Sequence, residues 1–167
     1  MDWHPWIVYA HVMGAFAFAA GHGVSATMAF RLRRERDPIR IGAILDMSLY
    51  SVSPTSLMSI GFVVLLLSGV AAGFEGAYWG RAWIWTSIVL LVVVTGLMTP
   101  FAAMHYNKVR AAVGQKAPRD KSDAPPPTPL PADQLEPLLL SPRPWQVAAV
   151  GGIGFALIVY LMVVKPF

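Results

Sequence analysis

The sequence predicts an all-α fold: an integral membrane four-helix bundle with both termini outside. Only 13% of the 167 residues are charged and 56% are hydrophobic, and the charged share is about half of that in soluble domains. Four apolar stretches are each long enough to cross a bilayer as a helix, which takes about 20 residues. The basic residues and the tryptophans agree on one orientation for these stretches. This composition argues against a free cytoplasmic enzyme.

Each spanning helix is predicted from an apolar run. The runs cover about residues 6–30, 54–74, 83–104 and 145–164. The first run has no basic residue before it and is too long for a signal peptide, so we expect it to remain uncleaved. The chain then divides into a three-span region, a proline-rich cytoplasmic linker and a fourth transmembrane helix, which cover residues 1–115, 116–144 and 145–167.

Basic residues set the expected orientation. Eleven of the thirteen Lys and Arg residues follow the first or the third span, and only Arg81 and Lys165 lie on the other side. The positive-inside rule places the two basic loops in the cytoplasm. Five tryptophans fall at the predicted outer interface, where aromatic belts form: Trp3, Trp6, Trp79, Trp83 and Trp85. We expect a multi-pass protein of the bacterial inner membrane that contacts lipids and other membrane subunits and binds no nucleic acid.

The two cytoplasmic connections carry further signals. Asp37-Pro38 is typical of a helix N-cap followed by proline. It predicts a helix over about residues 38–52, which lies at the inner interface or extends the second span with a kink. Nine of the fourteen prolines lie within residues 116–144, which favours extended structure without a core of its own. Leu138-Leu139-Leu140 interrupts this linker as a contact point on the membrane or on another subunit.

The candidate chemistry lies in the first span, which carries two histidines. His11 and His22 are eleven residues apart, which is three helical turns plus about 20°, so both leave one face about 16 Å apart along the axis. Most residues of this face are small, Gly14 among them, and Gly21 and Gly23 flank His22 with room for a flat macrocycle. Ionisable groups inside a membrane usually face the bundle interior as ligands, proton relays or substrate contacts.

Three interpretations of these histidines remain open: axial ligands of b-type haem, structural histidines bonded to a neighbouring span, and a proton or copper site. The two histidines are too far apart to bind one iron. The candidate partner for His22 is His105 near the inner end of the third span, and Met58 and Met162 are weaker candidate ligands. A five-coordinate haem or a ligand from another subunit also fits. Phe18 either fills space between helices or lies against a cofactor held by His22.

Three motifs resemble those of a group of small bacterial integral membrane proteins: His11-Val12-Met13-Gly14-Ala15, Arg36-Asp37-Pro38 and Leu66-Leu67-Ser68-Gly69. This group is similar to the copper-resistance D-like membrane proteins and to the four-helix, haem-binding protoporphyrinogen-oxidase-like family. The likeness covers about residues 5–105. It implies a four-helix bundle with a histidine-bearing first helix and haem b, and His11 matches the family histidine by position.

Together these observations predict a haem-b-binding membrane protein that takes part in electron transfer as a subunit of, or carrier for, a respiratory or photosynthetic complex. His11 and His22 would be its axial ligands. The alternative is a non-catalytic accessory subunit that packs through the small side of the first span and binds lipid, pigment or partner helices. No acid–base set suggests catalysis on a separate substrate. The absence of cysteine excludes disulfides, thiolate metal sites and a catalytic thiol.

Overall fold

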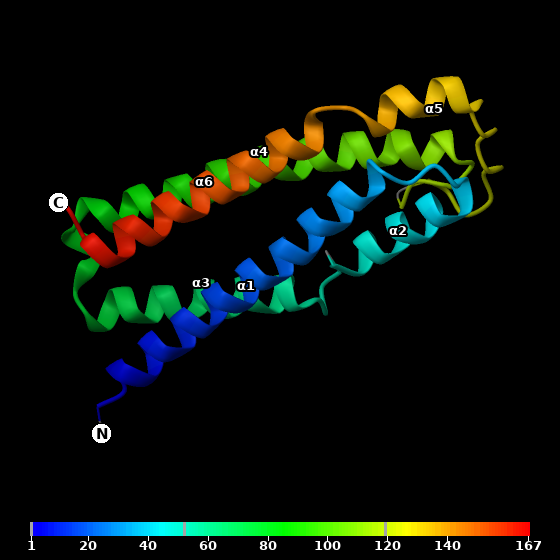
Figure 1. The fold of residues 1–167 in the computed structure, drawn as a ribbon. Helices are drawn as coiled ribbons and strands as arrows, with labels where there is room; N and C mark the ends of the chain where they lie inside the picture. Colours follow the sequence, from blue (N-terminus) through cyan, green and yellow to red (C-terminus); the bar gives the residue numbers. More distant parts are fainter. Residues whose placement is uncertain (1, 52, 119) are drawn as a thin grey trace.

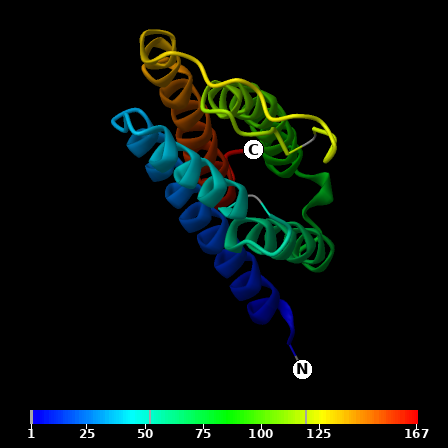
Figure 2. The ribbon, with the colours of Figure 1, turned by 90° about the vertical axis from the view of Figure 1, so that its right-hand side faces the viewer.

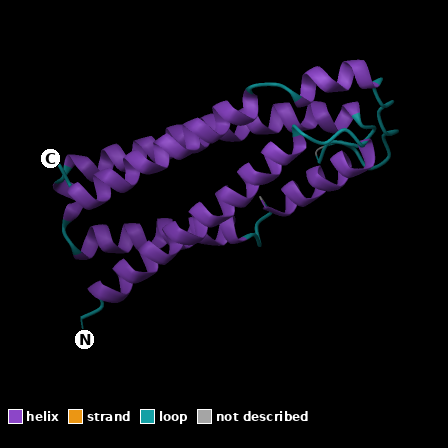
Figure 3. Cartoon of the chain, viewed as in Figure 1, coloured by secondary structure: helices purple, strands orange, loops and turns teal. Residues whose placement is uncertain are grey.

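The computed structural model describes residues 2–51, 53–118 and 120–167. Regular structure in these residues is helical, without strands (Figure 3). Four segments are long and apolar enough to cross a membrane, and they contain the helices α1 (His4–Leu32), α3 (Leu57–Glu75), α4 (Ala82–Ala112) and α6 (Arg143–Val164). The predicted all-α membrane fold is confirmed.

The spans form two pairs, α1 with α3 and α4 with α6, as Figure 1 shows. Both termini lie at one end of the molecule, which we call the outer end. The connections from α1 to α2 (Pro38–Ser51) and from α4 to α5 (Ala132–Leu139) lie at the opposite, inner end. Helix α1 is inclined to the α4/α6 pair, so its inner half approaches that pair while its outer half crosses α3.

Glycines bring α1 and α3 into close contact. A β-carbon on Gly14 would lie 2.6 Å from the backbone nitrogen of Leu65, and one on Gly61 would lie 2.6 Å from the backbone nitrogen of Phe18. One on Gly21 would lie 2.8 Å from the nitrogen of Met58. Small residues such as glycine allow the backbones of two membrane helices to approach this closely. The close approach increases van der Waals contact, which holds helices together in lipid, where the hydrophobic effect does not act between them.

The largest set of buried apolar side chains lies at the inner end, where α1, α2, α4 and α5 meet. We call this set the inner cap; its buried members are Leu32, Ile41, Leu45, Val109, Ala112, Leu135 and Leu139. Figure 2, viewed from this end, shows α2 alongside α1 and the connection to α5 passing over the end of α4. Helix α4 continues through Pro100 and past the predicted end of its span, because its last turns pack into the cap.

The inner cap corrects the expectation of an extended linker over residues 116–144. Part of that segment is the helix α5, whose Leu135 and Leu139 are only 5% and 1% exposed. Because these leucines are four residues apart, they share one helix face and cover apolar surface of the other cap helices. Leu139 therefore contacts this chain itself rather than a membrane or another subunit. The prolines before α5 form the non-helical stretch that reaches it, and the N–H of Leu130 donates to the carbonyl of Ala112 at 2.9 Å.

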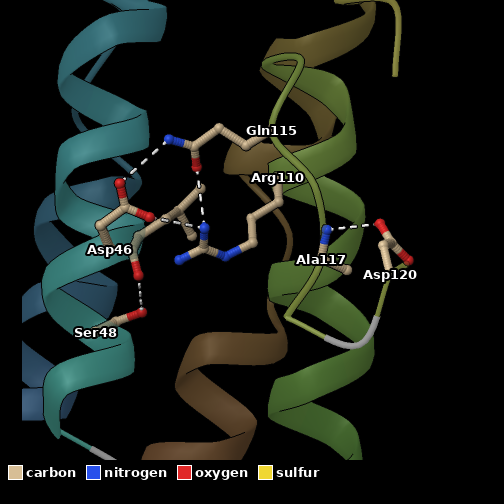
Figure 4. Close-up of polar contacts among 7 residues, drawn as sticks. Asp46, Ser48, Arg110, Gln115, Ala117 and Asp120 are labelled. Atoms are coloured by element: carbon tan, nitrogen blue, oxygen red, sulfur yellow. Dashed lines mark hydrogen bonds and ion pairs between the residues drawn. The ribbon is translucent and has the colours of Figure 1, made fainter. Parts of the chain in front are cut away.

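Polar contacts tie the cap helices to one another (Figure 4). The guanidinium of Arg110 on α4 donates to the carboxylate of Asp46 on α2 at 2.9 Å and to the side-chain oxygen of Gln115 at 3.1 Å. The Arg110 side chain is 5% exposed, whereas that of Asp46 is 58% exposed. Asp37 also caps α2 as predicted, because its carboxylate accepts from the N–H of Ile39 at 2.9 Å. The helix expected over residues 38–52 is thus present as α2, and position 52 lies outside the described residues.

Candidate functional site

A cavity of about 260 Å³ between the two helix pairs receives the side chain of His22. All four spans contribute to its wall, chiefly through Phe18 and His22 of α1, Met58 of α3, Thr95 and Met98 of α4, and Gly151 of α6. The hydroxyl of Thr95 donates to the carbonyl of Leu91 at 2.7 Å, so it is satisfied within its own helix. The wall is therefore mainly apolar, and the imidazole is its one ionisable group within the described part of the chain.

Two potential metal donors meet at Gly151. A β-carbon on this residue would lie 2.7 Å from Nε2 of His22 and 2.9 Å from Sδ of Met98. Distances under 3.0 Å essentially never occur for real Cβ atoms, so a larger residue here would displace one or both side chains. Neither ring nitrogen of His22 has a hydrogen-bond partner among the described residues. The ring is thus placed with its Nε2 beside a thioether and no protein group bonded to it.

Aromatic rings pack beside the imidazole. The rings of Phe18 and His22 are stacked, with centroids 6.5 Å apart and an interplanar angle of 16°. Phe18 also contacts Phe62 of α3 at 5.7 Å and Phe155 of α6 at 6.4 Å between centroids. Phe18 therefore fills the space between helices, the first of the two roles considered for it, and also lines the cavity of His22. Its contact with a cofactor stays a prediction.

His11 lies in a different environment, against α3. Its Nδ1 is 3.0 Å from the carbonyl oxygen of Leu65 and 3.5 Å from the hydroxyl of Ser68. A β-carbon on Gly69 would lie 2.9 Å from Cε1 of the ring. His11 thus has the contacts expected of a structural histidine. The two histidines share a helix face, but only the inner half of α1 reaches α4 and α6 (Figure 1), so His11 turns to α3 and His22 to the cavity.

The remaining predicted site residues separate into two groups. Met58 and Gly23 line the cavity with His22, and a β-carbon on Gly23 would have no neighbour within 4 Å. His105 and Met162 are not among the residues that line it. His105 is 5% exposed and lies near the inner end of α4, with its ring edge-on to that of Tyr106 at 5.3 Å. The structure thus brings His22 together with Met58 but not with His105.

Gly14 and Gly21 lie at the contact between α1 and α3 rather than on the cavity wall. Their lack of a side chain is accounted for by the close approach of the two backbones. The room beside the ring of His22 comes instead from Gly23 and from Gly151 and Gly152 of α6.

Comparison with known proteins places the chain in a membrane family. The model of one family, DUF2269, described as a predicted integral membrane protein, matches residues 5–166. The chain belongs to the DUF2269 family. No curated protein and no solved structure matches it. Membership in DUF2269 and the four spanning segments together make this chain a multi-pass integral membrane protein in contact with lipid. The finer resemblance to haem-binding membrane families stays a prediction.

Met98 is a cavity residue of this DUF2269 member that was not predicted from the sequence. A signal was present in the third span, where Leu91, Val94, Thr95 and Met98 recur at the spacing of one helix face. All four line the cavity. The face of α4 that meets α1 depends on how the two helix pairs pack together. This packing cannot be predicted from the hydropathy of a single span.

Proposed function

We propose that the protein binds haem b in the cavity between its helix pairs, with His22 as an axial ligand, and takes part in electron transfer in the bacterial inner membrane. The observation that carries this proposal is the placement of His22. Among the described residues its Nε2 has no hydrogen-bond partner, and it lies at an open cavity between the helix pairs. Imidazole is a standard axial ligand of haem iron, and ionisable groups inside a membrane bundle usually serve such purposes.

The chemistry of the side chains around His22 suits an apolar, iron-containing group. Met58 and Met98 add thioether sulfurs, which ligate haem iron together with histidine. Glycines 23 and 152 leave open space beside the ring. The volume of about 260 Å³ is below the roughly 300–1,000 Å³ of pockets that hold small organic groups, so the helix pairs would have to move apart to admit haem. When bound, haem supplies one-electron chemistry. The chain would orient the group through His22 and exclude water through the apolar side chains of four helices.

A copper(I) site is the second candidate, because imidazole and two thioethers also form a soft ligand set. A bare ion needs only donors at bonding distance, about 2 Å for imidazole nitrogen and somewhat more for sulfur. Side chains that close in to these distances would leave no cavity between them. The volume beside His22 therefore favours an organic group over an ion. In the accessory-subunit alternative, partner helices would bind at another surface, since the small side of α1 packs on α3 through Gly14 and Gly21.

The test is the optical spectrum and metal content of the full chain, purified in detergent from cells with adequate haem supply. We expect a reduced-minus-oxidised band at roughly 560 nm, where imidazole-ligated b-type haem absorbs, and iron in stoichiometric amounts. His22→Ala removes or shifts the band. His4→Ala is the matched control, because His4 lies at the outer end and pairs with Glu75 at 3.5 Å. A colourless wild-type protein contradicts haem binding, and stoichiometric copper without haem supports the second candidate instead.

A further inference from the structure

We propose that Arg33, Lys108 and Arg143 hold the phosphate group of an anionic phospholipid at the inner end of the bundle. Each cation comes from a different helix, since Arg33 caps the end of α1, Lys108 is on α4 and Arg143 begins α6. This inference goes beyond the proposed function, because it concerns the inner ends of the spans and not the cavity of His22.

The three positive charges converge on one imidazole. Arg33, Lys108 and Arg143 all lie near enough to His105 for their charges to act on its ring. His105 is only 5% exposed, and neither of its ring nitrogens has a hydrogen-bond partner among the described residues. Like charges that are close together repel one another, so an anion that binds among them stabilises the arrangement.

Carboxylates of the chain itself do not supply this anion. Within the described part of the chain, no acidic side chain forms an ion pair with Arg33, Lys108 or Arg143. The ion pairs at the inner end involve other arginines: Arg36 with Glu136 at 3.4 Å, Arg40 with Asp37 at 3.6 Å, and Arg110 with Asp46 at 2.9 Å. The charge of these three residues is therefore available to an anion from outside the chain.

One of the cations is held in position by the fold. The guanidinium of Arg33 donates through Nη1 to the carbonyl of Ser141, in the connection between α5 and α6. This bond joins the end of α1 to the start of α6 and keeps the Arg33 side chain between them. A guanidinium carries five N–H groups, so further donors remain for the oxygens of a phosphate, which arginine binds well.

An exposed tryptophan places this cluster at the level of the lipid headgroups. Trp145 is 59% exposed, and its ring packs on that of Phe30 with centroids 4.4 Å apart. Tryptophan is enriched where the membrane meets water. Trp145 is two residues from Arg143 and Phe30 is three residues from Arg33, so the cations lie at this interface. Basic pockets between membrane helices on the cytoplasmic side bind anionic headgroups.

Helix α6 also offers an apolar surface to the acyl chains. Val150 and Leu157 follow Arg143 at intervals of seven residues, so the three share one helix face to within about 40°. Val150 is 39% exposed and Leu157 is 48% exposed. This face therefore has a cation at its inner end and apolar side chains toward the middle of the membrane. A phospholipid matches both features, whereas a free phosphate ion matches only the first.

The experiment measures phospholipid binding to the full chain in detergent by native mass spectrometry. Phosphatidylglycerol is the anionic probe, phosphatidylcholine is the zwitterionic probe with the same acyl chains, and inorganic phosphate is the competitor without chains. Arg143→Gln and Lys108→Gln each remove one charge of the cluster. Arg34→Gln is the matched control, because Arg34 is exposed, is the neighbour of Arg33 and is not among the charges that act on His105. Circular dichroism establishes that each variant is folded.

We expect phosphatidylglycerol to bind more tightly than phosphatidylcholine. Arg143→Gln and Lys108→Gln should each weaken its binding about fivefold, the effect of one basic residue near an anionic membrane surface, and Arg34→Gln should weaken it less. The inference is overturned if the two lipids bind equally, if Arg34→Gln has as large an effect as Arg143→Gln, or if inorganic phosphate displaces the lipid at equal concentration. A colourless protein contradicts the haem proposal alone, since these measurements need no haem.

Discussion

Nδ1 of His11 lies 3.0 Å from the carbonyl oxygen of Leu65, so one of the two histidines of α1 is joined to α3. His11→Leu removes this bond and is expected to destabilise the protein by about 1 kcal/mol, the usual net value of one hydrogen bond. If His22 is the haem ligand, the same variant keeps the absorption band. Thermal unfolding in detergent and the optical spectrum measure the two effects. Loss of the band with unchanged stability would instead make His11 a ligand.

The contact between α1 and α3 depends on glycine. Gly14→Ala places a β-carbon 2.6 Å from the backbone nitrogen of Leu65, and the helices must separate to accommodate it. Overpacking of this kind costs about 1–3 kcal/mol. Gly96→Ala is the control, since a β-carbon there has no neighbour within 4 Å and alanine favours the helix by up to about 1 kcal/mol. The melting temperature should fall for Gly14→Ala and hold or rise for Gly96→Ala; equal shifts would contradict the packing explanation.

Substitutions of two adjacent leucines test whether α5 is packed against the inner cap. Leu139 is 1% exposed and Leu140 is 48% exposed. Leu139→Ala should cost about 2–5 kcal/mol, as large-to-small core changes do, and should release α5, while Leu140→Ala changes little. Limited proteolysis between residues 116 and 131 reports the release as faster cleavage. Cleavage at one rate in wild type and both variants would show that α5 does not hold this segment.

The ion pair between Arg110 and Asp46 is buried on one side only. Asp46→Ala leaves a guanidinium that is 5% exposed without its carboxylate, and an unpaired buried donor costs about 1–3 kcal/mol. Arg110→Met removes the charge and fills a similar volume, so it should cost less. The order of the two melting temperatures is the measurement. A lower melting temperature for Arg110→Met than for Asp46→Ala would mean that packing of the arginine stem outweighs its charge.

The orientation in the membrane can be tested by cysteine labelling, because the natural chain has no cysteine. Asp2→Cys lies at the outer end and Ser122→Cys in the inner connection, and both positions are exposed. The positive-inside rule predicts that an impermeant maleimide labels only Asp2→Cys in intact cells. After the membrane is permeabilised, both variants should react. The reverse pattern would invert the topology while leaving the fold unchanged.

The fold was largely predictable because the bilayer imposes a simple requirement on sequence. A span must satisfy its backbone internally and present apolar side chains outward, and both demands are visible in uninterrupted runs such as the one that became α3. The start of α2 was predictable for a local reason, since Asp37 and Pro38 act within one turn. Helix α5 was missed because nine prolines dominate the composition of its surroundings, whereas two leucines with the correct spacing decide its docking.

The candidate site was predictable only in part. Histidine in an apolar span is unusual enough to identify His22, and its neighbour Gly23 does border open space. The side chain that lies beside His22 was not predictable, because the inclination of the helices decides which residues of different helices meet. His105 was the candidate partner for His22 although the two differ in predicted depth, and the tilt of α1 brings the α4 surface around Met98 to His22 instead. The same tilt separates two histidines that a helical wheel places together.

Because of the position of the inner cap, we expect two parts of this chain to be stabilised in different surroundings, one in water and one in lipid. The leucines and isoleucine of the cap pack at the end with the basic connections, which we expect to lie outside the hydrocarbon region. Water would drive their association there, whereas α1 and α3 are held by close van der Waals contact within lipid. Urea should therefore loosen α2 and α5 at concentrations that leave the spans paired, and a harsh detergent should separate the spans first. A single melting curve would then conceal two transitions with different chemical sensitivities.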